Sequence, residues 1–514
     1  RYRAQDSPLR QLTSSSSNAR VRGIKMRRLR TYSRRTPARA ARSLSSVNYD
    51  SYLSSRASRR LPSAIRALQP LVSLPGMISL GGGMPHPSTF PFAKLSLEFK
   101  PTVGGEVVEV EGSELIAGLQ YSPTPGLPAL TSQLLAMQRA EHTPPPAADA
   151  DLALSVTTGS QDGLSKAFDM LLEEGDTLLI EEPTYSGSLA YLEPLGCTLT
   201  AVPTDAEGLV PSELRRMLES WPVTQKRPRV LYTIPTGGNP TGATLSAARR
   251  AELYAVACEH DLVVLEDDPY YYLQFEGGNA PPPVRSLLSI DTEARVLRFD
   301  SFSKLLSSGL RLGLVTGPAP LVERIDLHTQ ATTMHSCGIA QVMLLKLFDQ
   351  WALTHPEGAR GGFLAHCAST RDFYQQRRDA FVASAERHLG ERATWVEPAG
   401  GMFVWIKLHG VVDSQELIMV GALDAKGPLL ISFVCSFWLF SFLTLFSSHF
   451  FSLHFWIAKV LLVPGAAFLP ADAPPTPYVR AAFSTASEAD MDEAMRRLAL
   501  LLPEAEGEGG GAAE

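Results

Sequence analysis

From residue 150 onward, short apolar runs alternate with longer segments whose apolar residues recur at helical spacing. This alternation predicts helices that include 161–172 and 247–260. Strands alternating with helices predict an α/β fold with a mostly parallel sheet covered on both faces. Ligands of such sheets bind at the carboxyl ends of the strands, so we expect the functional residues there. The predicted strands are 152–157, 177–180, 230–234, 262–265 and 296–298.

The size and charge of the chain narrow its possible roles. It has 514 residues, 45% of them hydrophobic, and a formal net charge of −6. A chain of this length is expected to form roughly two or three domains. The mild acidity argues against nucleic-acid binding as a role of the whole chain, because phosphate contacts need clustered Lys and Arg. The five cysteines have the spacing of neither a metal site nor a disulfide framework, so we expect free thiols and no bound metal.

Two candidate motifs follow predicted strands. The first is Thr-Gly-Ser-Gln at 158–161, between a strand and a helix. Free backbone amides at a helix start favour a phosphate, although a serine that only caps the helix is the simpler interpretation. The second is Gly-Gly-Asn-Pro-Thr-Gly at 237–242, which is an ordinary turn unless the amide of Asn239 donates to a ligand.

Two further motifs place charged residues next to apolar strands. Asp267 follows the strand 262–265, and a carboxylate buried there needs a cationic partner. Asp268 is more consistent with a solvated turn. Lys304, in Asp-Ser-Phe-Ser-Lys, follows the strand 296–298, and its desolvation would lower its pKa and free the amine as a nucleophile. A lysine alone is ordinarily a surface charge, so this interpretation depends on the other motifs.

In this order and spacing, the four motifs resemble the class I and II aminotransferases, which depend on pyridoxal 5'-phosphate (PLP). The resemblance is strongest to kynurenine/2-aminoadipate and aromatic aminotransferases and runs from about Asn48 to Leu502. It implies fold type I, with a large domain built on a mostly parallel seven-stranded sheet between helices and a smaller α+β domain. The matching stretches include Gln-Tyr-Ser-Pro from 120, Glu-Pro-Thr-Tyr-Ser-Gly from 182 and Asp-Ser-Phe-Ser-Lys-Leu-Leu-Ser-Ser-Gly-Leu-Arg from 300.

The resemblance implies roles for individual residues around the cofactor. Lys304 would hold PLP as a Schiff base and move the substrate proton, and Asp267 would keep the pyridine nitrogen protonated. Tyr270 and Asn239, which also borders the substrate, would contact the 3-oxygen of the ring, and Tyr185 would stack on its face. The implied phosphate ligands are Ser160, Gln161, Ser301, Ser303 and Arg311.

The resemblance also implies residues on the substrate side. Arg480 matches the arginine that grips the substrate carboxylate with two parallel hydrogen bonds. Arg66 and Gly82 match a segment that moves over the substrate. Tyr121 matches a tyrosine that reaches the site of a neighbouring subunit, so the resemblance implies a homodimer with shared active sites. Thr236 stands where close relatives carry Asn, and we expect it to tune the pocket.

Composition and resemblance together predict how the chain is divided. We expect an N-terminal arm that contributes to the small domain over 47–83, a large PLP-binding domain over 84–345, a small domain over 346–503 and a disordered tail over 504–514. Residues 1–46 are rich in Arg and Ser, and Asp6 is their only acidic residue. This composition is typical of a mitochondrial presequence. A disordered basic tail on a cytoplasmic protein that starts at Met26 is the alternative.

One segment of the small domain does not fit the resemblance. Residues 428–458 form a run of 31 without Asp, Glu, Lys or Arg and hold eight of the 22 phenylalanines. The run is long enough to span a membrane. A single span would, however, put Arg480 on the wrong side of the bilayer, whereas removal of 428–459 restores the pattern of the family. We therefore favour a retained intron or an error in the gene model over a membrane anchor.

The predicted reaction is transfer of an amino group from an L-amino acid to 2-oxoglutarate, which gives a 2-oxo acid and glutamate. The candidate donors are 2-aminoadipate, kynurenine and aromatic amino acids. A PLP-dependent β-lyase activity is an alternative, because it would use the same Lys304 and Asp267. A transcription regulator built on an aminotransferase domain would need a winged helix-turn-helix before Asn48, and residues 1–46 show no apolar helical periodicity.

Overall fold

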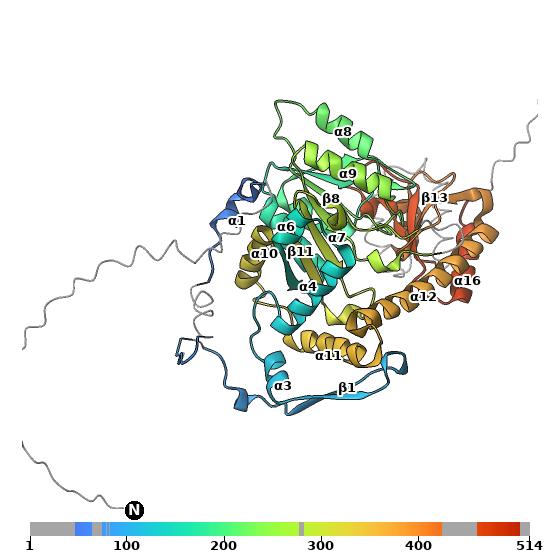
Figure 1. The fold of residues 1–514 in the computed structure, drawn as a ribbon. Helices are drawn as coiled ribbons and strands as arrows, with labels where there is room; N and C mark the ends of the chain where they lie inside the picture. Colours follow the sequence, from blue (N-terminus) through green and yellow to red (C-terminus); the bar gives the residue numbers. More distant parts are fainter. Residues whose placement is uncertain are drawn as a thin grey trace, which may run out of the picture. The chain divides into compact units, whose positions relative to one another are not determined.

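The computed structural model describes six stretches of the chain, whose fold is shown in Figure 1. The predicted presequence, the anomalous apolar segment, the tail, Arg66 and Gly82 lie outside the described residues. The described residues are 47–63, 74–78, 80–81, 83–276, 282–423 and 460–503.

A seven-stranded sheet forms the centre of the fold, in the order β3-β11-β10-β9-β8-β4-β5. The strands from β10 to β5 run parallel, whereas β11 is antiparallel to both β10 and β3. The mostly parallel sheet is therefore confirmed, although β5 and β11 were not among the predicted strands. The strands are β3 (Leu152–Thr157), β4 (Thr177–Glu181), β5 (Thr198–Val202), β8 (Val230–Thr233), β9 (Val263–Asp267), β10 (Val296–Ser301) and β11 (Gly313–Pro318).

Helices cover both faces of this sheet. In β4, Leu178 and Ile180 belong to the apolar core on one face, and Leu179 belongs to the core on the other. This alternation follows from the opposite directions of successive side chains in a strand. Burial on both faces explains why the strands are nearly continuous apolar runs. One face carries α6 (Ser160–Leu171), α7 (Ser186–Leu192) and α10 (Ala319–Ala331), and the other carries α8 (Pro211–Glu219) and α9 (Ala247–Glu259) (Figure 1).

The first described residues are anchored beside α6. Tyr49, in the short helix η1 (Tyr49–Ser51), donates its hydroxyl to the carbonyl of Ala294 at 2.7 Å. Tyr52 donates to the carbonyl of Asp261 at 3.0 Å. Both rings join the same apolar core as α6 and α10. The helix α1 (Ser55–Arg59) follows.

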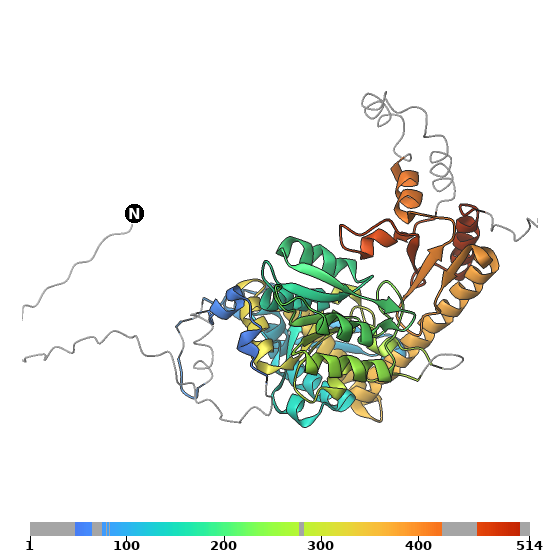
Figure 2. The same ribbon diagram turned by 90° about the horizontal axis from the view of Figure 1, so that it is seen from above.

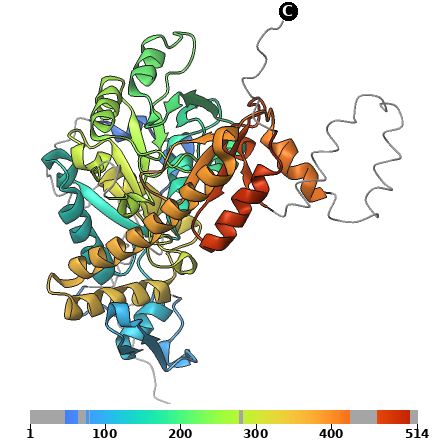
Figure 3. The same ribbon diagram turned by 90° about the vertical axis from the view of Figure 1, so that its right-hand side faces the viewer.

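A smaller antiparallel sheet, in the order β12-β13-β15-β14, forms the second centre of packing. Phe381, Ile406 and Met495 bring α12, β13 and α16 into one core. The helix α12 has 32 residues and runs from α11 to α16 (Figures 1 and 3). The elements are β12 (Ala393–Trp395), β13 (Phe403–Leu408), β14 (Val463–Pro464), β15 (Tyr478–Ala482), α11 (Gly338–Thr354), α12 (Gly358–Leu389), α13 (Ser414–Leu423) and α16 (Glu488–Ala499).

The chain on either side of the anomalous segment packs into one core. Leu417 of α13 shares this core with Val460 and Leu462, which are the first buried residues after the segment. The backbone N–H of Gly465 donates to the hydroxyl of Ser414 at 3.2 Å. In Figure 2 the orange helix α13 and the red segment after residue 460 lie side by side. The small sheet is thus completed by residues that return to it after the interruption.

The helix α3 (Gly112–Leu119) packs against α11, and α4 (Pro128–His142) packs against both α11 and β3. Within the described stretches, no helix is long and apolar enough to cross a bilayer. Nor do these stretches contain a group of three or more His, Cys, Asp or Glu placed to hold a metal. The four described cysteines are free thiols. The remaining elements are β1 (Lys94–Glu98), β2 (Val107–Glu111), α3 (Gly112–Leu119), α4 (Pro128–His142), α5 (Pro146–Ala150), β6 (Thr204–Asp205) and β7 (Gly208–Leu209).

Candidate active site

A cavity of about 340 Å³ lies where the strands of the large sheet end and the small sheet begins. Its walls come from loops after β3, β4, β8, β9 and β10 and from β13 and β15 of the small sheet. All of the predicted cofactor residues, together with Arg480, line it. The lining residues are Ser160, Gln161, Tyr185, Ile234, Asn239, Asp267, Pro269, Tyr270, Ser301, Ser303, Lys304, Ser308, Arg311, Phe403 and Arg480.

The topology of the sheet explains why residues so distant in sequence meet. The strands β3, β4, β8, β9 and β10 end at one edge, so the segments that follow them converge there. The strand β11 runs in the opposite direction and begins at that edge, where Gly313 pairs with both Thr157 and Ser301. Arg311, two residues before this strand, is thereby brought beside the start of α6.

One end of the cavity is built to hold an anion. Gly159 has φ +81°, and a Cβ at this position would lie 2.5 Å from NH2 of Arg311. The guanidinium of Arg311 donates to the carbonyl of Thr158 at 3.4 Å, the hydroxyl of Ser303 at 3.4 Å and the carbonyl of Ser308 at 3.3 Å. These are long for N–H···O hydrogen bonds. The arginine and the N-terminus of α6 together favour a phosphate at this end.

Asp267 provides a buried carboxylate in the wall of the cavity. Only 4% of the residue is exposed. Its Oδ2 accepts a hydrogen bond from the hydroxyl of Tyr232 at 2.8 Å, and its buried Oδ1 has no partner within the described part of the chain. Burial raises the pKa of Asp267 to about 7, although the bond from Tyr232 opposes this increase. A buried carboxylate with one unpaired oxygen fits a cationic N–H group.

Lys304 lines the same cavity. Burial lowers the pKa of Lys304, and the positive charges of Arg480 and Arg311 lower it further. The fraction of neutral amine at neutral pH is therefore larger than for an exposed lysine. A neutral amine is the form that attacks a carbonyl carbon and the form that accepts a proton.

Arg480 is held between two aromatic rings. Its guanidinium carbon lies 4.3 Å from the ring centre of Phe403 and 4.9 Å from that of Phe468, which belongs to η11 (Gly465–Phe468). Its NH1 donates to Oδ1 of Asn239 at 2.9 Å, and its buried Nε has no partner among the described residues. The guanidinium is therefore oriented with donors left for a carboxylate. Sequence patterns did not identify the two phenylalanines, because nothing local distinguishes them from core residues.

Two predicted residues lie away from the cavity lining. The side chain of Tyr121 is directed to His335, with ring centres 6.1 Å apart, and the residue is 50% exposed. Thr236 is completely buried and accepts a hydrogen bond from NH2 of Arg250 at 2.9 Å. The expected effect of Thr236 on the pocket is therefore not supported, because its hydroxyl is engaged by a buried arginine.

Asp268 is not the solvated turn residue that its neighbourhood suggested. It is 1% exposed, and its Oδ2 accepts a hydrogen bond from NH1 of Arg298 at 2.8 Å. NH2 of the same arginine donates to Oδ1 of Asp300 at 2.8 Å. Arg298 is completely buried on β10, so it connects the segment that carries Asp267 with the segment that leads to Lys304. This buried pairing, which is remote in sequence, explains why the prediction was wrong.

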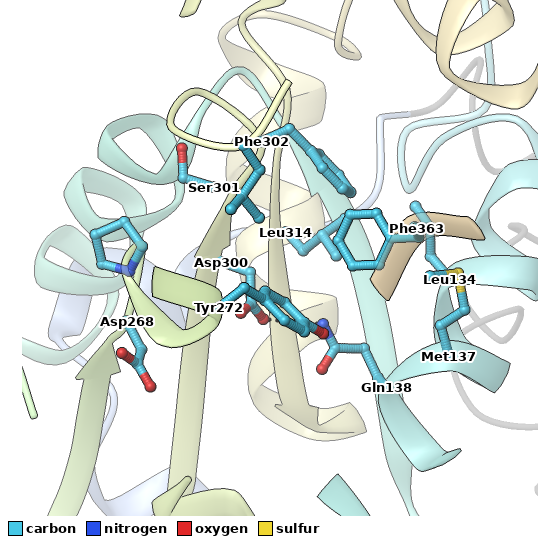
Figure 4. A pocket seen from close by; sticks show the side chains of 12 residues that line it. Leu134, Met137, Gln138, Asp268, Tyr272, Asp300, Ser301, Phe302, Leu314 and Phe363 are labelled. Atoms are coloured by element: carbon cyan, nitrogen blue, oxygen red, sulfur yellow. Dashed lines mark hydrogen bonds between the residues drawn. The ribbon is translucent and has the colours of Figure 1, made fainter. Parts of the chain in front are cut away.

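A second, smaller cavity of about 30 Å³ lies behind the Lys304 loop (Figure 4). Figure 4 shows the side chains of Gln138 and Asp300 meeting there, and Nε2 of Gln138 donates to Oδ2 of Asp300 at 2.9 Å. A space of this size fits a molecule no larger than water. Of these two cavities, only the one that Lys304 and Arg480 line can accommodate a cofactor and a substrate.

The described side chains of the larger cavity fit PLP. The cofactor has a phosphate, an aldehyde and a ring nitrogen, and these correspond to the anion-binding end, the amine of Lys304 and the unpaired Oδ1 of Asp267. The ring nitrogen of PLP would satisfy the unpaired Oδ1 of Asp267, and a substrate carboxylate would satisfy the unpaired Nε of Arg480.

Comparison with known proteins identifies the family of the chain. The family model for aminotransferase class I and II matches residues 117–498. The mitochondrial kynurenine/alpha-aminoadipate aminotransferase of Mus musculus is 38% identical over 470 residues, which cover 89% of this chain and 100% of the relative. An aminotransferase of Emericella nidulans is 37% identical over 461 residues, which cover 87% of this chain and 94% of the relative.

Solved structures show the same fold. A kynurenine aminotransferase of Pyrococcus horikoshii, in complex with PMP, matches with a TM-score of 0.62 and 27% identity, over 88% of this chain and 97% of its own. An aminotransferase of Candida albicans matches with a TM-score of 0.73 and 24% identity, over 88% of this chain and 98% of its own. The family match includes both sheets and every described residue of the cavity. The chain therefore belongs to the class I and II aminotransferases of fold type I, and it is a PLP-dependent enzyme that transfers amino groups between amino acids and 2-oxo acids.

Proposed function

We propose that this enzyme transfers the amino group of 2-aminoadipate, kynurenine or an aromatic L-amino acid to 2-oxoglutarate, giving the 2-oxo acid and glutamate. The observation that carries the proposal is the position of Arg480, which lines the same cavity as Lys304 and whose Nε has no partner among the described residues. An α-amino acid presents a carboxylate and an amine on adjacent atoms, so one substrate can engage both residues. The names of the kynurenine/alpha-aminoadipate and aromatic aminotransferases among the relatives support the choice of donors.

Lys304 has the central role in the proposed reaction. Its lowered pKa favours the neutral amine, which attaches the cofactor and then accepts the proton from the substrate Cα at its Nζ. The same Nζ would then deliver this proton to the cofactor carbon that carried the aldehyde, and with the 2-oxo acid it would move a proton from that carbon to Cα. Bound PLP supplies an electron-withdrawing ring that stabilises the negative charge left at Cα.

Neighbouring residues orient the cofactor and the substrate. Asp267 would hold a proton on the ring nitrogen through its unpaired Oδ1. Since Oδ1 of Asn239 accepts from Arg480, its Nδ2 remains to donate to the 3-oxygen of the ring, together with the hydroxyl of Tyr270. Tyr185 would cover the ring face. The proposed phosphate ligands are Ser160, Gln161, Ser301, Ser303 and Arg311.

The assembly and location of the enzyme are also proposals. We infer a homodimer with shared sites, because Tyr121 is half exposed and lies outside the cavity of its own chain, where a second copy could use it.

A mitochondrial location is supported by the names of the relatives and by the basic composition of 1–46. N-terminal sequencing of the mature protein tests the location, since a start at Met26 or earlier contradicts a cleaved presequence. We also propose 345/346 as the boundary between large and small domains.

The test of the reaction is the visible absorption of the PLP-loaded protein during addition of amino acids. With a preferred donor we expect loss of the long-wavelength absorption of the bound cofactor, and with 2-oxoglutarate its return. The variant Lys304→Ala is expected to lower kcat by roughly 10⁴-fold, because general acid–base catalysis alone contributes up to this factor. Lys407→Ala, at an exposed position of β13, is the matched control and should keep the wild-type rate. A Lys304→Ala protein that retains wild-type kcat contradicts the proposal.

A further inference from the structure

Tyr232 is a buried residue whose hydroxyl lies directly behind Asp267. It belongs to β8, has no exposed surface and packs its ring edge-on against Phe168, with ring centres 5.5 Å apart. Its hydroxyl donates to Oδ2 of Asp267 at 2.8 Å. The hydroxyl of Ser188, from α7, donates to the oxygen of Tyr232 at 3.0 Å. The three side chains form one chain of hydrogen bonds from a helix to the cavity.

The direction of this chain follows from the number of protons available. Tyr232 has a single hydroxyl proton, and the carboxylate of Asp267 can only accept. The tyrosine therefore gives its proton to Asp267, and Ser188 must donate to the tyrosine oxygen. Burial raises the pKa of Tyr232 well above its usual value, so the hydroxyl remains a neutral donor at physiological pH.

The bond from Tyr232 has two consequences for Asp267. It occupies Oδ2, so Oδ1 is the oxygen that stays unpaired, on a residue that lines the cavity. It also stabilises the ionised carboxylate. Burial and the nearby negative charges of Asp268, Glu181 and Asp300 act in the other direction and raise the pKa of Asp267. No other described side chain donates to Asp267, so Tyr232 is the main group that opposes its protonation.

We propose that Tyr232, oriented by Ser188, is a positioning residue that keeps Asp267 ionised and directs its Oδ1 to the ring nitrogen of PLP. This inference rests on the proposed role of Asp267. It adds two residues that touch neither cofactor nor substrate and that act only through the carboxylate. A tyrosine that serves only to fill the core would have the same packing but no influence on the ring nitrogen.

The test compares PLP with its 1-deaza analogue, in which a C–H group replaces the ring nitrogen. Both compounds carry the same aldehyde and phosphate, so the difference in their dissociation constants isolates the nitrogen. The constants are measured by absorbance titration of the apo-protein. We expect Tyr232→Phe to weaken PLP binding about tenfold, the effect of losing a hydrogen bond to a charged group. Binding of the 1-deaza analogue should change less than about twofold, since it does not need an ionised Asp267.

Three further variants make the outcome specific. Tyr191→Phe removes a hydroxyl from a ring that also packs against Phe168, and it should alter neither constant. Ser188→Ala keeps the tyrosine and should weaken PLP selectively by about two- to threefold, through the loss of one neutral hydrogen bond. It provides the same comparison if Tyr232→Phe does not fold. In Asp267→Asn protein, addition of Tyr232→Phe should cause no further selective loss of PLP.

The two levels of the proposal fail differently. Tyr232→Phe or Ser188→Ala could instead weaken the binding of PLP and of the 1-deaza analogue equally. This result would assign these residues a purely structural role and overturn the inference. If Asp267→Asn discriminates between the two compounds and Tyr232→Phe does not, only the role of Tyr232 is overturned. If Asp267→Asn itself shows no selective loss of PLP, the proposed function of Asp267 fails as well.

Discussion

Replacement of Arg480 by methionine separates substrate recognition from stability. Methionine retains an unbranched apolar stem between Phe403 and Phe468 but removes the guanidinium and its bond to Asn239. A substrate carboxylate would lose two charge-assisted hydrogen bonds, each worth about 1.5–3 kcal/mol. A loss of about 4 kcal/mol corresponds to roughly a 10³-fold decrease in kcat/KM, at 1.36 kcal/mol for each factor of ten.

The same change should have little effect on the stability of the free protein. Burial lowers the pKa of Arg480, and its Nε has no partner among the described residues, so removal of the charge relieves an uncompensated desolvation cost. The two cation–π contacts that are lost are worth about 0.5–1 kcal/mol each. Because these effects oppose each other, we expect the free energy of unfolding to change by no more than about 1 kcal/mol.

The assay is the half-reaction of the PLP-loaded enzyme with an amino acid and with the corresponding amine, which has no carboxylate. Arg480→Met should lower the rate constant for the amino acid about 10³-fold and leave that for the amine within about threefold, because only the amino acid uses the guanidinium. Arg480→Lys, which keeps the charge but not the fork of donors, should be intermediate. Equal losses for both compounds, or a collapse of the unfolding midpoint, would refute the reasoning.

Three other perturbations test separate parts of the structure. Gly159→Ala would place a methyl group 2.5 Å from NH2 of Arg311, so PLP binding should weaken about tenfold or more through the lost phosphate contact. Pyridoxal has no phosphate and should bind with an unchanged dissociation constant. Equal weakening of both compounds would contradict the phosphate assignment. Burial raises the pKa of Glu181 to about 7, so its protonated form stabilises the fold below the ordinary glutamate pKa and this contribution disappears as the pH rises through 7. Between pH 5 and 8 the free energy of unfolding of the apo-protein should fall by up to about 3 kcal/mol, and Glu181→Gln should reduce that decrease. Chemical denaturation at each pH measures both proteins, and identical pH profiles for the wild type and the variant would contradict the role of Glu181. Deletion of 428–459 should leave a soluble protein that binds PLP, because the flanking residues already share one core, whereas loss of PLP binding would show that the segment is needed.

The sequence by itself was sufficient for the elements whose signals are local. The apolar runs predicted β3, β4, β8, β9 and β10 within a few residues, because burial on both faces makes each strand visible as a continuous run. The four motifs predicted the cavity residues because each follows directly after a strand that ends at the same edge. Lys304 and Asp267 were selected by their positions after apolar strands, and their roles were implied by the resemblance to the class I and II aminotransferases.

Only the tertiary structure revealed the residues that act through distant partners. The antiparallel strand β11, which brings Arg311 to the start of α6, has no local signal that separates it from a parallel strand. The pairing of Asp268 with Arg298, the sandwich around Arg480 and the bond from Tyr232 to Asp267 each join residues on different elements. Burial and hydrogen bonding of this kind depend on the position of every neighbouring side chain, and spacing along the chain does not determine it. Sequence motifs therefore identified the residues proposed to contact PLP, whereas the fold decided how their charges are oriented and balanced.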